Sequence, residues 1–213
     1  MANNDLADLN TKLSTALRDT THAVWLTGEI DQLNKYAVAS LYPQFARPLD
    51  PSATTVVLVA NTYFYSLPAG VREVSSVDLS TGTTSEQGTL DGQSWQIVGD
   101  TYAGTGKIRV APGIVNSWPT YTLRLTGYGV WDTATNLITD DLAPLALATA
   151  RAEAYRRVGA DRAQFRQWAR NDPTKDMSQN ELILLINEAD AEIRRIRATV
   201  GRTWRRPVPG RAG

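Results

Sequence analysis

Residues 178–200, "SQNELILLINEADAEIRRIRATV", predict the longest helix of the chain and set its architecture. Ser178 and Glu181 have the spacing of a capping box, in which each side chain accepts a backbone N–H at the start of a helix. Apolar residues then recur at helical spacing for about five turns. They are Leu182, Leu185, Ile186, Ala189, Ile193, Ile196 and Val200. Such a stripe has to be buried, so this helix needs other elements packed against it.

Further helical patterns lie on both sides of a long non-helical region. We expect helices over residues 5–18, 27–43, 140–159 and 161–169. Thr27 is the expected N-cap of the second of these helices, and Pro43 is expected to stop it. Asp140 and Asp141 are expected to cap the third. The two N-terminal helices form a thin core by themselves, so the economical arrangement packs them against the C-terminal helices.

The central region, residues 54–131, has the two-residue period of β-strands. Apolar residues alternate with polar ones, as in Val77 with Leu79 and Ile108 with Val110. Turn signals such as Asp91-Gly92 and Pro112-Gly113 separate these segments. We expect a compact antiparallel β module, either a sandwich or a small barrel.

Together these patterns predict an α+β fold. A discontinuous α-helical bundle domain, 1–50 and 133–201, carries an inserted antiparallel β module, 51–132, and ends in an extended basic C-terminal arm, 202–213. Such an insertion is tolerated where the two chain ends of a domain lie close together.

Composition limits the chemistry. The 213 residues include no cysteine and one histidine, which removes disulfides and cysteine-bound zinc and fits assembly in a reducing cytoplasm. The chain opens on the polar "MANNDLADLN", without the pattern of a secretory signal, and its apolar runs are shorter than the roughly 20 residues that span a bilayer. We therefore expect a soluble protein without a membrane partner.

No motif predicts an enzyme, a metal site or a cofactor site. In residues 99–110, "GDTYAGTGKIRV", the glycine spacing fails the phosphate-loop pattern, and strand character on both sides favours a hairpin tip. His22 has Asp19 nearby but no accompanying nucleophile motif, so we expect a surface or loop histidine. The carboxylates are scattered rather than set at the spacing of a metal-binding loop.

The charge is balanced overall but uneven along the chain. Lysine and arginine number 22 and aspartate and glutamate number 22, yet beyond Glu192 the chain has only arginines among its charged residues. An acidic body with a basic end is typical of an interaction surface. We expect Gly201 to end the last helix and Pro207 and Pro209 to keep the remainder extended. The expected docking-arm residues are Arg202, Trp204, Arg205, Arg206 and Arg211, and a disordered solubilising end is the alternative.

A second basic group lies on the expected helices over 151–170. Its arginines, interleaved with aromatic residues, are Arg156, Arg157, Arg162, Arg166 and Arg170. Nucleic-acid binding is one interpretation. Because acids interrupt the group and the aromatics fall at core spacing, we favour a subunit interface or a solvated helix. A position along a channel stays open.

Three stretches resemble the head-to-tail adaptor (connector) proteins of tailed bacteriophages. They are 17–37 "LRDTTHAVWLTGEIDQLNKYA", 65–79 "YSLPAGVREVSSVDL" and 142–172 "LAPLALATARAEAYRRVGADRAQFRQWARND". The likeness covers about residues 5–201 and is one of element order, without a catalytic motif.

The resemblance implies a structural virion protein of the neck, the junction between capsid and tail, that assembles in the host cytoplasm. It implies a ring, typically of twelve copies, that attaches beneath the portal protein, extends the DNA channel and joins a downstream tail or neck protein. The C-terminal segment of such proteins commonly reaches into the portal, and proximity to genomic DNA is nonspecific. The alternative is a tail or baseplate binding module whose β domain recognises a glycan or a tail-fibre partner. A hydrolase is a third hypothesis, resting only on unpaired carboxylates.

Overall fold

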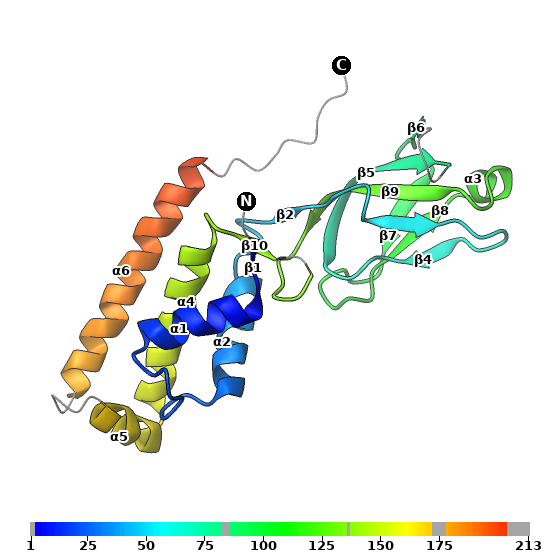
Figure 1. Ribbon diagram of the computed structural model, residues 1–213. Helices are drawn as coiled ribbons and strands as arrows, with labels where there is room; N and C mark the ends of the chain where they lie inside the picture. Colours follow the sequence, from blue (N-terminus) through cyan, green and yellow to red (C-terminus); the bar gives the residue numbers. More distant parts are fainter. Residues whose placement is uncertain (1–2, 82–85, 136, 172–177, 204–213) are drawn as a thin grey trace. The chain divides into compact units, whose positions relative to one another are not determined.

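A computed structural model describes residues 3–81, 86–135, 137–171 and 178–203, which form helices and antiparallel sheets (Figure 1). The α+β class predicted from the sequence is confirmed. The chain divides into two compact units, one made of residues 1–43 and 131–205 and the other centred on residues 44–130. Each unit has its own hydrophobic core and is described by itself.

The helical unit contains five helices and one short strand pair among its described residues. The helices are α1 (Leu6–Ala16), α2 (Thr27–Ala39), α4 (Ala143–Ala160), α5 (Arg162–Asn171) and α6 (Gln179–Thr203). The strands β1 (Asn3–Asn4) and β10 (Ile138–Thr139) pair antiparallel. This pairing joins the first residues of the chain to the segment that enters α4, so the two halves of the unit are connected through hydrogen bonds as well as packing.

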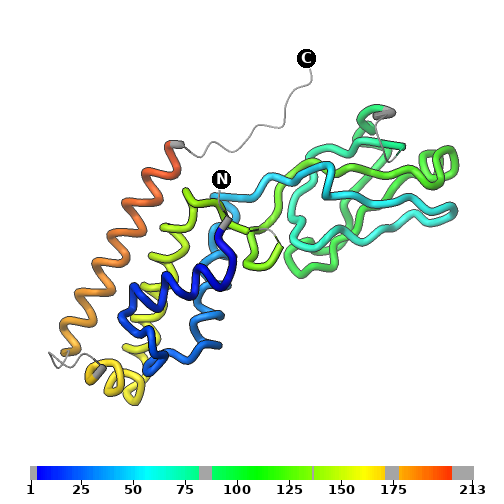
Figure 2. The backbone as a smooth tube through the Cα atoms, in the orientation of Figure 1, coloured from blue at the N-terminus to red at the C-terminus, as the bar shows by residue number. Residues whose placement is uncertain are grey.

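Helix α4 is the centre of this unit. It contacts α1, α2, α5 and α6, and in Figures 1 and 2 it runs between α2 and α6. Nine of its residues are buried, and six of these are alanines that let neighbouring helices approach closely. A helix that is apolar around most of its circumference has to be covered on several sides. The four helices that contact α4 provide this cover.

The other unit contains two antiparallel sheets and one short helix. One sheet contains β2 (Arg47–Pro48), β3 (Thr55–Val57), β5 (Val71–Ser80), β6 (Glu86–Thr89) and β9 (Thr122–Gly129), with β9 at its centre. The second sheet contains β4 (Phe64–Ser66), β7 (Trp95–Val98) and β8 (Lys107–Val110). Helix α3 (Pro112–Ser117) follows β8.

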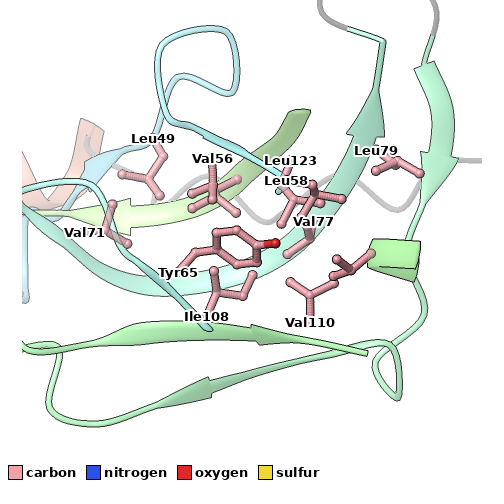
Figure 3. Close-up of a cluster of buried hydrophobic side chains, with 12 residues drawn as sticks. Leu49, Val56, Leu58, Tyr65, Val71, Val77, Leu79, Ile108, Val110 and Leu123 are labelled. Carbon is pink, nitrogen blue, oxygen red and sulfur yellow. The ribbon is translucent and has the colours of Figure 1, made fainter. Parts of the chain in front are cut away.

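Both sheets contribute to one core (Figure 3). Val77 on β5 and Leu123 on β9 come from the first sheet, while Ile108 on β8 and Tyr65 on β4 come from the second. The Tyr65 hydroxyl accepts a hydrogen bond from the Val59 amide at 3.1 Å, so the polar end of this buried ring is satisfied. The alternating apolar residues of the sequence therefore form the inner faces of two packed sheets.

The start and end of some elements differ from the sequence predictions. The N-cap of α2 is Leu26 rather than Thr27, and the Glu29 carboxylate accepts the Leu26 amide at 2.9 Å. The α2 helix ends at Ala39, before Pro43. The expected turn at Pro112-Gly113 is instead the first turn of α3. Proline is tolerated there because a backbone N–H at the first position of a helix would have no acceptor within the helix.

The predicted caps of α4 are also wrong. Its N-cap is Leu142, with no side-chain hydrogen bond. Asp140 instead accepts the Asn4 side-chain amide at 3.0 Å, and Asp141 accepts the Thr139 hydroxyl. Both carboxylates therefore accept hydrogen bonds from residues of the β1–β10 pair and do not cap α4. By contrast, the capping box of α6 is confirmed, since Ser178 N donates to Glu181 at 2.7 Å and Glu181 N donates to Ser178 at 3.3 Å.

Candidate interaction surfaces

Helix α5 is attached to α4 through aromatic contacts. Trp168 is buried, with its ring centre 5.9 Å from that of Phe165 and 6.4 Å from that of Tyr155 on α4. Burial raises the pKa of the Tyr155 phenol, and the nearby Arg151 opposes this shift. The aromatics of residues 151–170 are therefore packing residues, as their spacing predicted, and they fix the orientation of α5.

Two amides add polar contacts to this attachment. Gln164 and Gln167 donate to the carbonyls of Val24 and Ala23, in the segment between α1 and α2. That segment is held by the buried carboxylate of Asp19, which accepts the amides of residues 23, 24 and 25. One face of α5 thus packs and forms hydrogen bonds within the unit, and its opposite face lies at the surface.

The structure divides the helical arginine group in two. Arg156 pairs with Asp190 of α6 at 2.5 Å, and Arg157 pairs with Glu153 at 3.4 Å. The other three side chains, Arg162, Arg166 and Arg170, are exposed on α5, and no ion pair joins them to a carboxylate within the described ranges. Of the five arginines in this group, these three are the ones without an ion pair to a described carboxylate.

Helix α6 is covered on one side only. Its buried side packs on α4, and Arg151 of α4 pairs with Glu192 of α6. In its first half, Ile183 and Leu184 are 50% and 59% exposed, although they lie in the apolar run 182–186. A helical segment that is apolar on all sides is typical of a helix covered on all sides. Within the part of the chain that the structure describes, nothing covers the side of α6 that bears Ile183 and Leu184.

The second half of α6 is basic instead of apolar. Arg194, Arg195, Arg197 and Arg202 are exposed there, and no acidic residue follows Glu192. The predicted docking arm included Arg202, but α6 continues through Gly201 to Thr203, so Arg202 is a helical residue. Glycine costs only about 1 kcal/mol within a helix, which explains why Gly201 does not end this one. The other arm residues, Trp204, Arg205, Arg206 and Arg211, lie outside the described residues.

A further pair of exposed apolar side chains lies on α2. Leu26, next to the start of this helix, is 67% exposed, and Tyr36 on its outer face is 54% exposed. In Figure 1, α4 runs between α2 and α6, so Leu26 and Tyr36 belong to a different side of the helical unit from Ile183 and Leu184.

We also searched the described residues for a ligand pocket, a metal site and a membrane-spanning helix. A cavity of about 40 Å³ beside Arg72 is far smaller than ligand pockets of roughly 300–1,000 Å³. No group of histidine and carboxylate residues within the described ranges could hold a metal ion, and no helix there could cross a membrane.

His22 lies in the turn after α1, half-buried, with its Nδ1 atom lacking a hydrogen-bond partner among the described atoms. The segment 99–106 joins β7 to β8, as expected for a hairpin tip.

No protein-family model matches this chain, and no curated protein matches it. The interaction surfaces are therefore known from their geometry alone. The exposed pair Ile183 and Leu184 was missed at the sequence level, because both lie outside the predicted apolar stripe of this helix and were given no role. The five consecutive apolar residues of 182–186, more than one helix face can hold, were the signal that could have revealed it.

Proposed function

We propose that this protein is a structural virion component, a head-to-tail adaptor that forms a ring beneath the portal of a tailed bacteriophage, extends the DNA channel and joins the capsid to the tail. It is not an enzyme. The observation that carries the proposal is the uncovered apolar surface of α6 at Ile183 and Leu184. Apolar side chains exposed on a rigid element are the usual anchors of a protein interface.

The exposed apolar side chains of α2 support a ring in particular. Leu26 and Tyr36 belong to a helix on another side of α4 from α6. A contact between Ile183 and Leu184 of one copy and the α2 side of the next would join unlike surfaces. Such contacts repeat from copy to copy and, where the rotation closes, produce a ring.

Charge supports attachment of this ring to a second protein. The arginines beyond Glu192 give the end of the chain a positive charge, while the rest is equally negative. Arginine forms planar, paired hydrogen bonds with carboxylates, and the single Trp204 adds an aromatic anchor. A symmetric ring repeats this contact in every subunit, so a modest affinity per copy gives a durable joint.

The direct test is the mass of the purified protein in solution, alone and mixed with the portal protein. A version ending at Thr203 is the matched variant, because it removes the arm and keeps α6 whole. We expect a large complex with portal for the full chain and none for the shortened one. A protein that stays monomeric and never joins portal would contradict the proposal.

The alternative, a tail or baseplate module that binds a glycan through its β domain, has less support. Carbohydrate-binding surfaces need exposed aromatic side chains, but Trp95 and Trp118 pack against the core of the β unit. The exposed aromatics described in this unit are Phe64 and Tyr102. Binding of residues 44–130 to a glycan array would restore the alternative.

A further inference from the structure

We infer that the outer face of α5 is a binding surface for the phosphate backbone of double-stranded nucleic acid. The surface consists of Arg162, Arg166 and Arg170, and we call it the arginine stripe. The inference rests on the proposed function for its natural partner, a genome that passes through the ring. The binding itself is a property of this face and can be measured separately.

The three arginines form a regular row. They follow one another at intervals of four residues, so each lies about 6 Å further along the helix on nearly the same face. All three are exposed, while Trp168 on the opposite face is buried. Helix α5 therefore presents three aligned cations from a fixed position.

The stripe differs from the other arginines next to it by having no carboxylate partner among the described residues. Arg151, Arg156 and Arg157 of α4 all pair with carboxylates of their own unit. On α5 the described residues contribute no acid to the exposed face, and like charges four residues apart on a helix repel one another. The three guanidinium groups repel one another along the helix. An anionic partner bound to this face would reduce that repulsion.

The rest of this face favours nucleic acid over an acidic protein. Its other exposed residue is Ala163, which provides no large apolar side chain. Gln167 is exposed as well, but its side-chain amide donates to the Ala23 carbonyl. Protein interfaces usually depend on buried aromatic or aliphatic anchors, whereas a phosphate backbone offers dense charge and hydrogen-bond acceptors alone. The guanidinium group suits phosphate, since it can donate two parallel hydrogen bonds.

The same composition favours a duplex over a single strand. Binding of single strands usually relies on aromatic side chains that stack on the bases. The aromatics of α5 contact each other, with Trp168 buried and Phe165 half-buried, so neither is an exposed stacking platform. The stripe can therefore contact only the backbone, and we expect binding without sequence preference.

The test measures binding of the full-length protein to a fluorescein-labelled DNA duplex of random sequence, by anisotropy over a series of sodium chloride concentrations. One variant carries Arg162→Gln, Arg166→Gln and Arg170→Gln. The control carries Arg194→Gln, Arg195→Gln and Arg197→Gln, which removes the same charge from exposed positions of α6. The arm keeps its arginines in every protein, so its contribution is constant.

Each phosphate contact changes the slope of log affinity against log salt by about 0.9, so loss of the stripe should make the slope shallower by about 2.7. The control should keep the wild-type slope. Replacing the three stripe residues by lysine should also keep most of the slope, because the charges remain. Circular dichroism at 222 nm checks that each variant is folded.

Two results would overturn the inference. One is an equal loss of DNA binding in the stripe variant and the control, which would mean that net charge alone decides. The other is a stripe variant that binds DNA like the wild type. Failure of the proposed function is seen separately, as a protein that binds DNA through the stripe but never joins portal.

Discussion

The buried carboxylate of Asp19 organises the turn between α1 and α2. It accepts the backbone amides of Ala23, Val24 and Trp25 at 2.8 to 3.0 Å. The change Asp19→Ala leaves buried amides without an acceptor, which should lower the free energy of unfolding by about 2–4 kcal/mol. Urea unfolding followed at 222 nm measures this change.

A matched control for this carboxylate is Asp161. It also accepts two backbone amides, those of Ala163 and Gln164, but it is exposed. Because water can replace an exposed acceptor, Asp161→Ala should cost about 1 kcal/mol. Equal losses in the two variants would show that burial of Asp19 does not matter.

In the β unit, Gly127 is required by a close approach of two strands. A Cβ atom at this position on β9 would lie 2.0 Å from the carbonyl oxygen of Glu73 on β5. The overlap is with backbone, which cannot rotate away, so Gly127→Ala should destabilise the unit by about 3 kcal/mol or more. Near-UV circular dichroism during urea unfolding reports this loss.

The control for this glycine is Gly92, where an added Cβ atom would have nothing within 4 Å and the backbone angle φ is not positive. Gly92→Ala should change the stability by less than about 1 kcal/mol. The interpretation of the β5–β9 approach would be wrong if Gly127→Ala were equally mild.

At the scale of elements, the contact of α4 with α5 includes a titratable side chain, the buried phenol of Tyr155. Burial raises the pKa of this phenol in the folded protein, whereas the unfolded chain has the ordinary value of about 10. Below that pH both states are neutral and the stability is complete. As the pH rises above about 10, the unfolded state loses its proton first, so the free energy of unfolding falls until the folded-state pKa is passed.

The variant Tyr155→Phe should therefore remove part of the alkaline destabilisation. Urea unfolding at pH 8 should give a stability within about 1 kcal/mol of wild type, since the phenol is neutral there. At pH 11 the variant should be the more stable of the two proteins. A wild type and a variant that lose stability in parallel between these pH values would contradict the role of Tyr155.

The elements that the sequence predicted well are those governed by neighbours in the chain. The capping box of Ser178 and Glu181 joins residues three apart, and the alternation around Ile108 needs only a two-residue period. The caps of α4 failed because Asp140 bonds to Asn4, 136 residues away. Local patterns contain no information about such a distant partner.

The candidate surfaces show the same limit. The sequence grouped five arginines that the fold then separates, because Arg156 finds its partner Asp190 through the packing of α4 on α6. The spacing of Arg162, Arg166 and Arg170 was visible, but their freedom from partners was not. Likewise, the exposure of Leu184 depends on α4 covering a single side of α6.

For the whole molecule, the proposed ring depends on the helical unit, where the uncovered apolar surface and the arginine stripe both lie. Leu184 is the more exposed of the two large apolar residues at the surface of α6, at 59%, and its side chain would become buried between copies. Leu184→Asp places a charge in that interface, where it would have no partner. We expect assembly to weaken at least about 100-fold, equivalent to about 2.7 kcal/mol per contact, as measured by sedimentation velocity.

The control for this change is Ala198→Asp, which adds the same charge at an exposed position in the basic half of α6. It should leave assembly intact, and both variants should keep the helical signal of the wild-type monomer, because neither position lies in the core. If Leu184→Asp assembled as well as the control, the α6 surface would not join the copies. A ring would then have to form through surfaces other than this one, and the exposed apolar residues would lose their place in the proposal.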